Sequence, residues 1–211
     1  KDDFAALGRR LFGEAPEPVR LMGPEDLEEV LRFIRLHDTD DYKAAKIAFE
    51  HVGFSQPVER DAHFVLIEPD ERRPVGVIGY SIDDLEAHGT YWLGWTYVNP
   101  FFRGRGYGST LMVYVKEVLR ELAARKLFLS TSGLEKYAAA VSFYERHGFT
   151  QEGRLVDFYA DGDDKILMGC RIASPASPRT SHLEDARKRR PDPTPPKPDE
   201  DDDPSGGSSP G

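Results

Sequence analysis

Apolar residues recur along this chain at two spacings, and the spacings separate the predicted helices from the predicted strands. Repeats of three and four residues predict helices at about 24–35, 42–52, 109–122 and 134–147. Runs of β-branched and aromatic residues predict strands at about 19–22, 63–67, 75–82, 91–98, 126–131, 153–159 and 165–172. The predicted order is therefore β-α-α-β-β-β-α-β-α-β-β, which indicates an α/β (α+β) domain.

The three strands at 63–67, 75–82 and 91–98 follow one another with short connections, which favours an antiparallel meander. Strict alternation along the third strand predicts two faces. One face would carry Trp92, Gly94 and Thr96, and the other Tyr91, Leu93, Trp95 and Tyr97. The polar segment 37–41 predicts a solvated connector between the first two helices, because it is too short to enclose a metal ion.

A glycine-rich turn joins the aromatic strand to the helix that follows it. Residues 103–108 read RGRGYG, so glycines alternate with Arg105 and Tyr107 just before the helix begins. The first turn of a helix has unpaired N–H groups and a partial positive charge, and glycine lets a ligand approach the backbone closely. Such a turn binds phosphate oxygens. The alternative is a turn that only connects the strand to the helix.

The spacing of these glycines separates several kinds of phosphate site. No Lys precedes Ser109, which argues against a P-loop, and G-x-G-x-G is one residue short of the dinucleotide-binding pattern. The run does fit Q/R-x-x-G-x-G/A, and here the sequence resembles the GNAT acetyltransferases. The order of elements over residues 18–172 also resembles the GNAT fold, a mixed, mostly antiparallel sheet of about seven strands with helices on both faces.

The resemblance implies acetyl-CoA as cosubstrate and no metal. In this family the strand before the glycine loop and the strand after the central helix splay apart, and the pantetheine arm lies between them. An open strand edge offers N–H and C=O groups to an amide-bearing ligand. The implied coenzyme-binding residues, with the side chains of Arg105 and Tyr107 as rim contacts, are Val98, Arg103, Gly104, Arg105, Gly106, Tyr107, Gly108 and Ser109.

A second signature lies in the last predicted helix. Residues 142–149 read SFYERHGF and resemble the FYEKxGF segment of many acetyltransferases. Tyr144 matches the tyrosine that often protonates the departing thiolate, and a phenol of pKa ~10 suits a thiolate of pKa ~8.5. The alternative role for Tyr144 is packing on the helix face. Where many relatives carry an Asn that bonds the coenzyme, this chain has Tyr137, and Ser132 or Lys136 are the candidate substitutes.

The general base is not carried over by the resemblance. Relatives place a Glu or His on the strand before the loop, at the positions of Trp92 and Gly94 here. An ammonium group has no lone pair, so the acceptor must lose a proton before it attacks a thioester. The remaining candidates are a bound water chain and the side chains of Glu86, His88 and Asp157.

The function implied is transfer of an acetyl group from acetyl-CoA to a primary amine of a small molecule or peptide, by direct attack in a ternary complex. Residues 157–168 resemble the hairpin of N-terminal protein acetyltransferases of the ribosomal-protein type, where a tyrosine touches the peptide. Tyr159 would take that role, and Trp92 is the second candidate acceptor contact. The alternatives are such a peptide enzyme, or a catalytically silent acyl-CoA-binding module. Cys170 as an acyl carrier is a weaker alternative, because buried cysteines are usually inert.

Composition and charge limit the possible partners and the cellular compartment. The formal net charge of −9 disfavours non-specific nucleic-acid binding, and a single cysteine fits a reducing compartment. No apolar stretch is long enough for a membrane span, so a cytoplasmic monomer or homodimer is expected. We expect an arm or short helix at 1–17, the catalytic domain at 18–173 and a disordered, proline-rich and charge-rich tail at 174–211.

Overall fold

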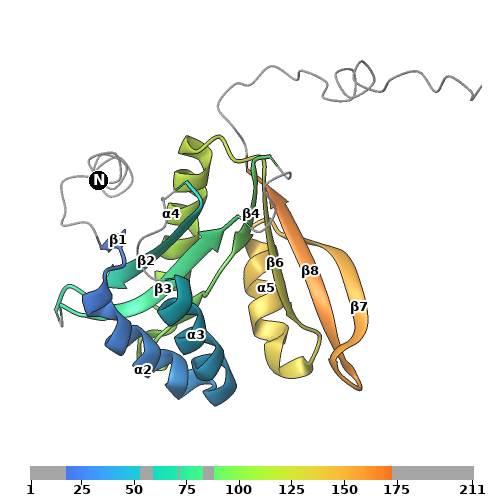
Figure 1. The fold of residues 1–211 in the computed structure, drawn as a ribbon, viewed down its shortest axis with the longest axis horizontal. Helices are drawn as coiled ribbons and strands as arrows, with labels where there is room; N and C mark the ends of the chain where they lie inside the picture. The colour runs from blue at the N-terminus through green and yellow to red at the C-terminus, as the bar shows by residue number, and fades with distance from the viewer. Residues whose placement is uncertain (1–17, 53–58, 71, 83–87, 173–211) are drawn as a thin grey trace, which may run out of the picture. The chain divides into compact units, whose positions relative to one another are not determined.

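The computed structural model describes residues 18–52, 59–70, 72–82 and 88–172, with the side chains of 50–52 left out (Figure 1). The predicted arm at 1–17, the predicted tail at 174–211 and the candidate base Glu86 lie outside the described residues. The described part of the chain forms the sheet and helices expected for the predicted domain.

The sheet follows the order β1-β2-β3-β4-β6-β8-β7, and a further short strand, β5, pairs with β3. All recorded pairs are antiparallel except β4 with β6, which confirms the mixed, mostly antiparallel sheet. The meander is formed by β2, β3 and β4 as predicted. The strands are β1 (Val19–Leu21), β2 (Asp61–Ile67), β3 (Pro74–Ser81), β4 (Thr90–Leu93), β5 (Tyr97–Val98), β6 (Lys126–Ser132), β7 (Thr150–Ala160) and β8 (Asp163–Arg171).

Helices lie on both faces of the sheet. The pair α2 (Leu27–His37) and α3 (Thr39–Val52) covers one face, and α4 (Tyr107–Glu121) covers the other (Figure 1). The last helix, α5 (Ala138–Arg146), packs against the same core as α4. Alternating residues of the central strands explain this division. Phe64 and Ile78 are buried on the α4 side, while Val65 and Val77 are buried on the α2–α3 side.

The predicted connector at 37–41 is shorter than expected. Only Asp38 separates α2 from α3, and its carboxylate accepts hydrogen bonds from the N–H groups of Asp40 at 2.8 Å and Asp41 at 3.1 Å. An aspartate that accepts from the second and third residues of a helix is an N-cap. The polar residues after Asp38 therefore begin α3, and the prediction of a five-residue break was wrong.

The predicted strand at 91–98 is interrupted, and this corrects its predicted faces. Tyr91 and Leu93 pack into the core on the α4 side, whereas Trp95 and Tyr97 pack into the core on the α2–α3 side. Strict alternation would keep all four on one face, so the strand contains a bulge at Gly94 that reverses the phase. The interruption divides the strand into β4 and β5, which accounts for eight strands where about seven were expected.

The bulge also separates two neighbouring strands. Residues 90–92 of β4 pair with 126–128 of β6, but β5 pairs only with β3 among the described residues. Beyond Phe128, β6 pairs only with β8 in the same part of the chain. The edges of β5 and of the second half of β6 that face each other are therefore unpaired. This is the splay that the family resemblance implies.

Candidate active site

The glycine loop is held at the end of β5 by a short helical turn, η2 (Pro100–Phe102). Asn99 is buried; its Oδ1 accepts from the Phe101 N–H at 3.1 Å, and its own N–H donates to the Val75 carbonyl at 2.8 Å. Gly104 and Gly106 follow with φ values of 78° and 84°. A Cβ on either glycine would have no neighbour within 4 Å, so backbone conformation, rather than lack of space, requires glycine there.

The loop presents a row of free backbone donors. Within the described residues, no hydrogen bond is recorded for the N–H groups of residues 104–109. Gly106 is the N-cap of α4, and the first backbone bond of that helix runs from the Thr110 N–H to the Gly106 carbonyl at 3.0 Å. Unpaired N–H groups and the positive end of a helix dipole meet here, which is the arrangement that binds phosphate oxygens.

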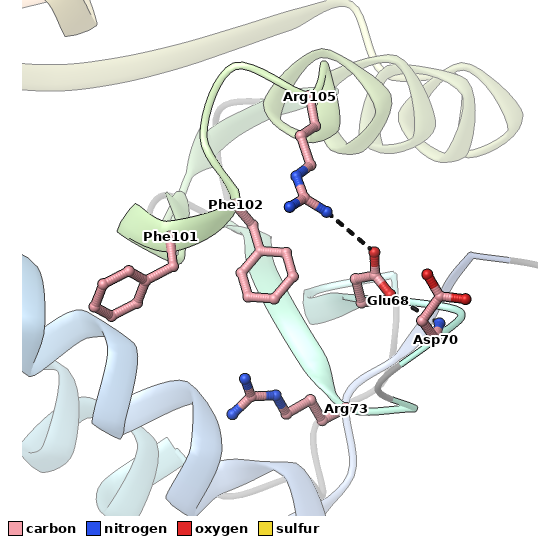
Figure 2. Close-up of a pocket in the computed structure, with 6 residues that line it drawn as sticks. All are labelled: Glu68, Asp70, Arg73, Phe101, Phe102 and Arg105. Atoms are coloured by element: carbon pink, nitrogen blue, oxygen red, sulfur yellow. Dashed lines mark hydrogen bonds and ion pairs between the residues drawn. The ribbon is translucent and has the colours of Figure 1, made fainter.

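The side chains of Arg105 and Tyr107 turn toward the end of β2. Both reach Glu68, a buried carboxylate whose Oε1 lies 3.4 Å from Arg105 Nη1 and accepts from the Tyr107 hydroxyl at 3.2 Å. Arg105 also lies over the ring of Phe102, with 4.9 Å between its Cζ and the ring centroid. Figure 2 shows Arg105 directed at Glu68 in an open pocket of ≈ 410 Å³. These contacts anchor the loop to the sheet; the sequence pattern gave no sign of Glu68.

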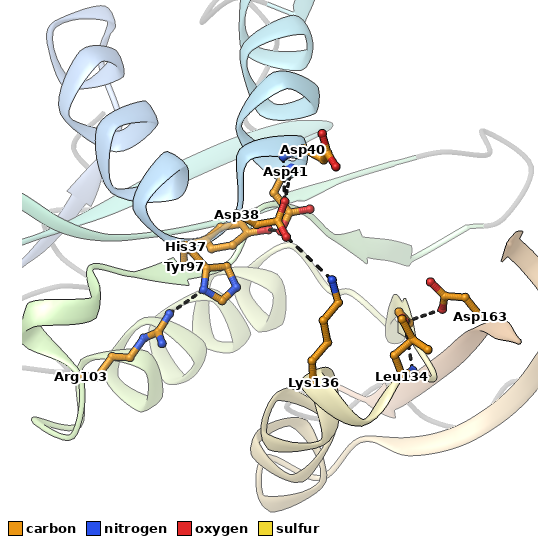
Figure 3. A network of polar contacts seen from close by, with 10 residues as sticks. His37, Asp38, Asp40, Asp41, Tyr97, Arg103, Leu134, Lys136 and Asp163 are labelled. Atoms are coloured by element: carbon orange, nitrogen blue, oxygen red, sulfur yellow. Dashed lines mark hydrogen bonds and ion pairs between the residues drawn. The ribbon is translucent and has the colours of Figure 1, made fainter.

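Arg103 points in another direction, toward the junction of α2 and α3. One of its Nη atoms donates to Nδ1 of His37 at 2.8 Å (Figure 3). Burial and the neighbouring guanidinium lower the pKa of His37. The ring of His37 meets Tyr97 edge-on at 5.3 Å, and the Tyr97 hydroxyl donates to Asp41 at 2.8 Å. Arg103 therefore connects the predicted phosphate loop with the face of the sheet that α2 and α3 cover.

The other predicted coenzyme residues gather at the start of α4. Gly108 lies against α5, where a Cβ would be 3.2 Å from Cε2 of Phe143, and Ser109 Oγ is 3.1 Å from Nε2 of His147. Val98 is half-buried and pairs with Gly76 of β3. The structure brings the predicted residues 103–109 and Val98 together at one end of the unpaired edges. Their binding of coenzyme A stays a prediction.

The two candidate substitutes for the missing Asn already have partners. Ser132 Oγ donates to Asp163 at 2.5 Å and accepts from the Leu134 N–H at 3.1 Å. Lys136 lies 4.0 Å from the Asp38 carboxylate (Figure 3). Each side chain thus takes part in a link between neighbouring segments near the end of β6.

Tyr144 meets the bulge from the α4 side of the sheet. It packs between Phe143 and Phe149, with ring centroids at 5.5 Å and 5.8 Å, and the nearby Thr96 side chain acts on the pKa of its hydroxyl in the direction opposite to burial. Burial raises the pKa of Tyr144 to about 12. The phenol therefore stays protonated across the physiological pH range and points toward the interrupted strand.

Three partly or fully buried tyrosines predict a loss of stability at alkaline pH. Burial raises the pKa of Tyr80, Tyr97 and Tyr144 above the ~10 expected in the unfolded chain. Their contribution is complete below pH ~10 and is lost as pH rises through the folded-state values. For Tyr144 the loss reaches about 2 kcal/mol near pH 12. We expect urea titrations to show the stability advantage of the wild type over Tyr144→Phe shrinking between about pH 10 and pH 12; a constant difference would contradict the raised pKa.

The structure does not bring the two candidate acceptor contacts together. Trp92 lies beside β6, with its ring 5.4 Å from that of Phe128. Tyr159 is 48% exposed near the tip of the β7–β8 hairpin. The strand registers place these positions about five residues apart along β8, or roughly 17 Å. At most one of them can contact the reacting amine of a small acceptor.

The hairpin before Tyr159 is held by Asp164. Strand β7 leaves its register with β8 between Leu155 and Ala160, and Asp157 has a φ of 53°. The Asp157 N–H donates to Asp164 Oδ1 at 2.8 Å, and this bond and the ion pair with Arg154 lower the pKa of Asp164. The Asp157 carboxylate accepts from the Gly162 N–H at 2.7 Å. Asp157 therefore shapes the turn, which argues against its role as a base.

The remaining sequence candidates are placed away from the bulge. His88 is exposed and precedes β4, six residues before Gly94, or roughly 20 Å along an extended chain. Cys170 is buried in β8, and burial raises the pKa of its thiol, which leaves it mostly unreactive. Among the described residues, no cluster of three or more His, Cys, Asp or Glu side chains is arranged to hold a metal ion. In that same part of the chain, every helix is too short or too polar to cross a membrane.

Comparison with known proteins identifies the family. The model of the acetyltransferase (GNAT) family matches residues 25–149. No curated protein sequence matches the chain. Among solved structures, a GNAT-family protein from Desulfovibrio desulfuricans is 30% identical, with a TM-score of 0.67 over 74% of this chain and 98% of its own.

Two further structures share the fold at lower identity. An aminoglycoside 6′-N-acetyltransferase in complex with coenzyme A is 16% identical, with a TM-score of 0.62 over 75% of this chain and 99% of its own. A spermidine N-acetyltransferase chimera derived in part from Vibrio cholerae is 18% identical, with a TM-score of 0.57 over 72% and 94%. The family model covers more than half of the chain and the Desulfovibrio structure shares its fold at 30% identity, so the chain belongs to the GNAT family of acetyltransferases.

Proposed function

We propose that this protein is an acetyl-CoA-dependent N-acetyltransferase that acts on a primary amine, with residues 18–173 as the catalytic domain. The observation that carries the proposal is the row of N–H groups at residues 104–109, for which no partner is recorded in the described part of the chain, beside edges of β5 and β6 that are unpaired in that same part. Phosphates of coenzyme A fit the first feature, and the amide-bearing pantetheine arm fits the second. Most of the binding would come from the backbone.

In this proposal the protein acts chiefly by holding two reactants together. The loop and the strand edge would orient the thioester at the bulge, where Thr96 and Tyr144 meet. Fixing the amine against the thioester replaces a bimolecular encounter by a nearly unimolecular step, which can supply several kcal/mol of the barrier. The remaining chemistry is removal of a proton from the amine and stabilisation of the departing thiolate.

Tyr144 is the proposed donor to the thiolate. Its pKa of about 12 lies some 3 to 4 units above that of a typical thiol, ~8.5, so complete transfer of the phenolic proton is uphill. A hydrogen bond from the phenol to the sulfur needs no such transfer and strengthens as negative charge develops there. We therefore assign Tyr144 the role of a hydrogen-bond donor that stabilises the leaving sulfur. The proton that the thiolate finally takes up comes from solvent.

Replacement of Tyr144 by Phe should lower kcat by about 100-fold, because it removes one donor aimed at charge that develops in the transition state. The dissociation constant for acetyl-CoA should change less than threefold, since the loop and the strand edge are untouched. Steady-state kinetics and calorimetric titration of the same preparation provide both numbers. An unchanged kcat would leave Tyr144 with a packing role only.

The proposed function is tested by titration of acetyl-CoA in a calorimeter, followed by thiol-release assays with spermidine, kanamycin and a tetrapeptide with a free amino terminus. Binding with acceptor-dependent thiol release is the expected result, and the acceptor that works best defines the acceptor class. A preference for the tetrapeptide would favour the ribosomal-protein type of N-terminal acetyltransferase. Binding without release would favour the silent acyl-CoA-binding module, and no binding would contradict the site itself.

A further inference from the structure

An imidazole from β2 reaches the bulge by crossing the backbone of β3. His63 pairs with Gly79 of β3, and a Cβ built on Gly79 would lie only 2.2 Å from Cδ2 and 2.5 Å from Nε2 of that ring. A Cβ on Gly94, in the bulge, would be 3.4 Å from the same Nε2. Neither glycine has a positive φ among those recorded, so the space they leave is their structural contribution. The ring lies across one glycine and ends beside the other.

The surroundings of the ring set which nitrogen carries its proton. Asp61, two residues earlier on the same face of β2, places Oδ1 3.3 Å from Nδ1 of His63. A carboxylate beside Nδ1 stabilises the tautomer that is protonated at Nδ1 and leaves Nε2 with a free lone pair. Phe49 of α3 meets the ring edge-on at 5.0 Å and restricts its rotation. Nε2, the nitrogen nearest Gly94, is therefore the basic atom.

Few charges face this ring. Asp61 is its only ionic partner among the described residues, and the other recorded neighbours are Phe49 of α3, Gly79 of β3 and Gly94 of the bulge. The side chains of His63 and Asp61 remain 15% and 20% exposed, so protons can exchange with solvent. A single carboxylate paired with a partly exposed imidazole is a common arrangement for a general base at neutral pH.

His63 and Tyr144 approach the bulge from opposite faces of the sheet. Tyr144 belongs to the core on the α4 side, while the neighbours of His63 belong to the α2–α3 side. The imidazole of His63 crosses β3 and ends beside Gly94, with Nε2 3.4 Å from the position of a Cβ there. A base on one side of the reacting group and a hydrogen-bond donor on the other suit a direct attack.

We propose that His63, oriented by Asp61, is the general base that deprotonates the acceptor amine; this rests on the proposed function. One N–H proton of the ammonium group moves to Nε2, and the freed lone pair forms the new C–N bond at the thioester carbonyl carbon. The C–S bond breaks, and sulfur leaves with its electron pair, stabilised by the Tyr144 hydroxyl and then protonated. After the C–N bond has formed, the nitrogen loses a second proton to solvent, and His63 passes the proton it accepted to solvent. The thiolate takes up one proton, so the products are an amide, a thiol and one proton.

His37, a second imidazole on this face among the described side chains, is excluded from the same role. Its Nδ1 accepts a hydrogen bond from Arg103, because a guanidinium can only donate. The proton of neutral His37 is therefore on Nε2, and no lone pair remains free. Loss of that contact would also release Arg103, so His37 is better described as part of the loop's support.

The decisive experiment compares His63→Gln with the wild type in the thiol-release assay, using whichever of spermidine, kanamycin and the tetrapeptide the wild type acetylates. We expect kcat/KM at pH 7 to fall by about 100-fold or more, and the acidic limb of the pH profile that belongs to the imidazole to disappear. Calorimetry should give an acetyl-CoA dissociation constant within twofold of the wild type. The matched control is His88→Gln, which changes an exposed imidazole at the start of β4 and should leave both quantities unchanged.

Two further measurements distinguish a role of His63 as base from a merely structural role. Asp61→Asn should also lower kcat/KM, without weakening acetyl-CoA binding. Nitrogen-15 spectra of the wild type should show that neutral His63 carries its proton on Nδ1 and none on Nε2. Wild-type kcat/KM in His63→Gln, a protonated Nε2 in neutral His63, or a parallel loss of coenzyme affinity would overturn the assignment. A wild type that binds acetyl-CoA but acetylates none of the three acceptors would contradict the proposed function, and the assignment of His63 with it.

Discussion

Replacement of Gly106 by Val is expected to weaken acetyl-CoA binding by at least about 100-fold. Gly106 has a φ of 84°, a left-handed conformation that a β-branched residue adopts only with a strain of roughly 1 to 3 kcal/mol. Relief of that strain would redirect the backbone N–H groups of the loop. The new side chain would also project into space that has no protein atom within 4 Å, which is where the phosphates are expected. Calorimetric titration of acetyl-CoA measures the loss.

A matched control separates backbone strain from the site. Gly162, in the β7–β8 turn, has a φ of 77° and equally open surroundings, so Gly162→Val should cost similar stability but leave acetyl-CoA affinity within about threefold. The acetyl-CoA affinity of Gly106→Asn should lie between those of Gly106→Val and Gly162→Val, because asparagine tolerates the left-handed region better than valine. Binding by Gly106→Val at wild-type affinity would remove the loop from the proposed coenzyme site.

Replacement of Gly79 by Ala is expected to reduce kcat/KM about as far as the loss of His63 itself, by about 100-fold, with acetyl-CoA affinity retained. The added methyl group would overlap the imidazole, since its position is 2.2 Å from Cδ2 of His63, and the ring would have to leave the bulge. The loop and the edge of β5 that are proposed to bind the coenzyme are not touched. Assays of thiol release and calorimetry on the same variant test the two expectations together.

A double-mutant cycle distinguishes this displacement from general damage to the sheet. If Gly79→Ala acts through His63, it should cost much less in the His63→Ala background, where the ring is absent, than in the wild type. Additive effects on kcat/KM would mean that the alanine disturbs β3 by another route. Thermal denaturation of each variant checks that all four proteins are folded.

The sequence by itself determined most of the helices and strands and the position of the glycine loop. The spacing of Leu111, Val115 and Val118 predicted α4, and the three glycines around its start predicted a phosphate-binding turn, because both signals depend only on residues close together in the chain. Tyr144 was identified as a candidate site residue from a short motif, residues 142–149, which is also a local signal. Family, fold class and the predicted loop therefore followed from the order of residues alone.

The tertiary structure decided which side chains meet. The bulge at Gly94 reversed the faces of the strand after it, because a single extra residue shifts the two-residue period of every later side chain. Glu68, just after β2, contacts the loop, and His63 of β2 lies beside Gly94, although no motif connects this strand with the loop. Both placements depend on strand register, and that of His63 also on the absence of side chains at Gly79 and Gly94, which are relations between distant segments. Such relations leave no periodic trace in the sequence, and they are fixed only when the sheet is assembled.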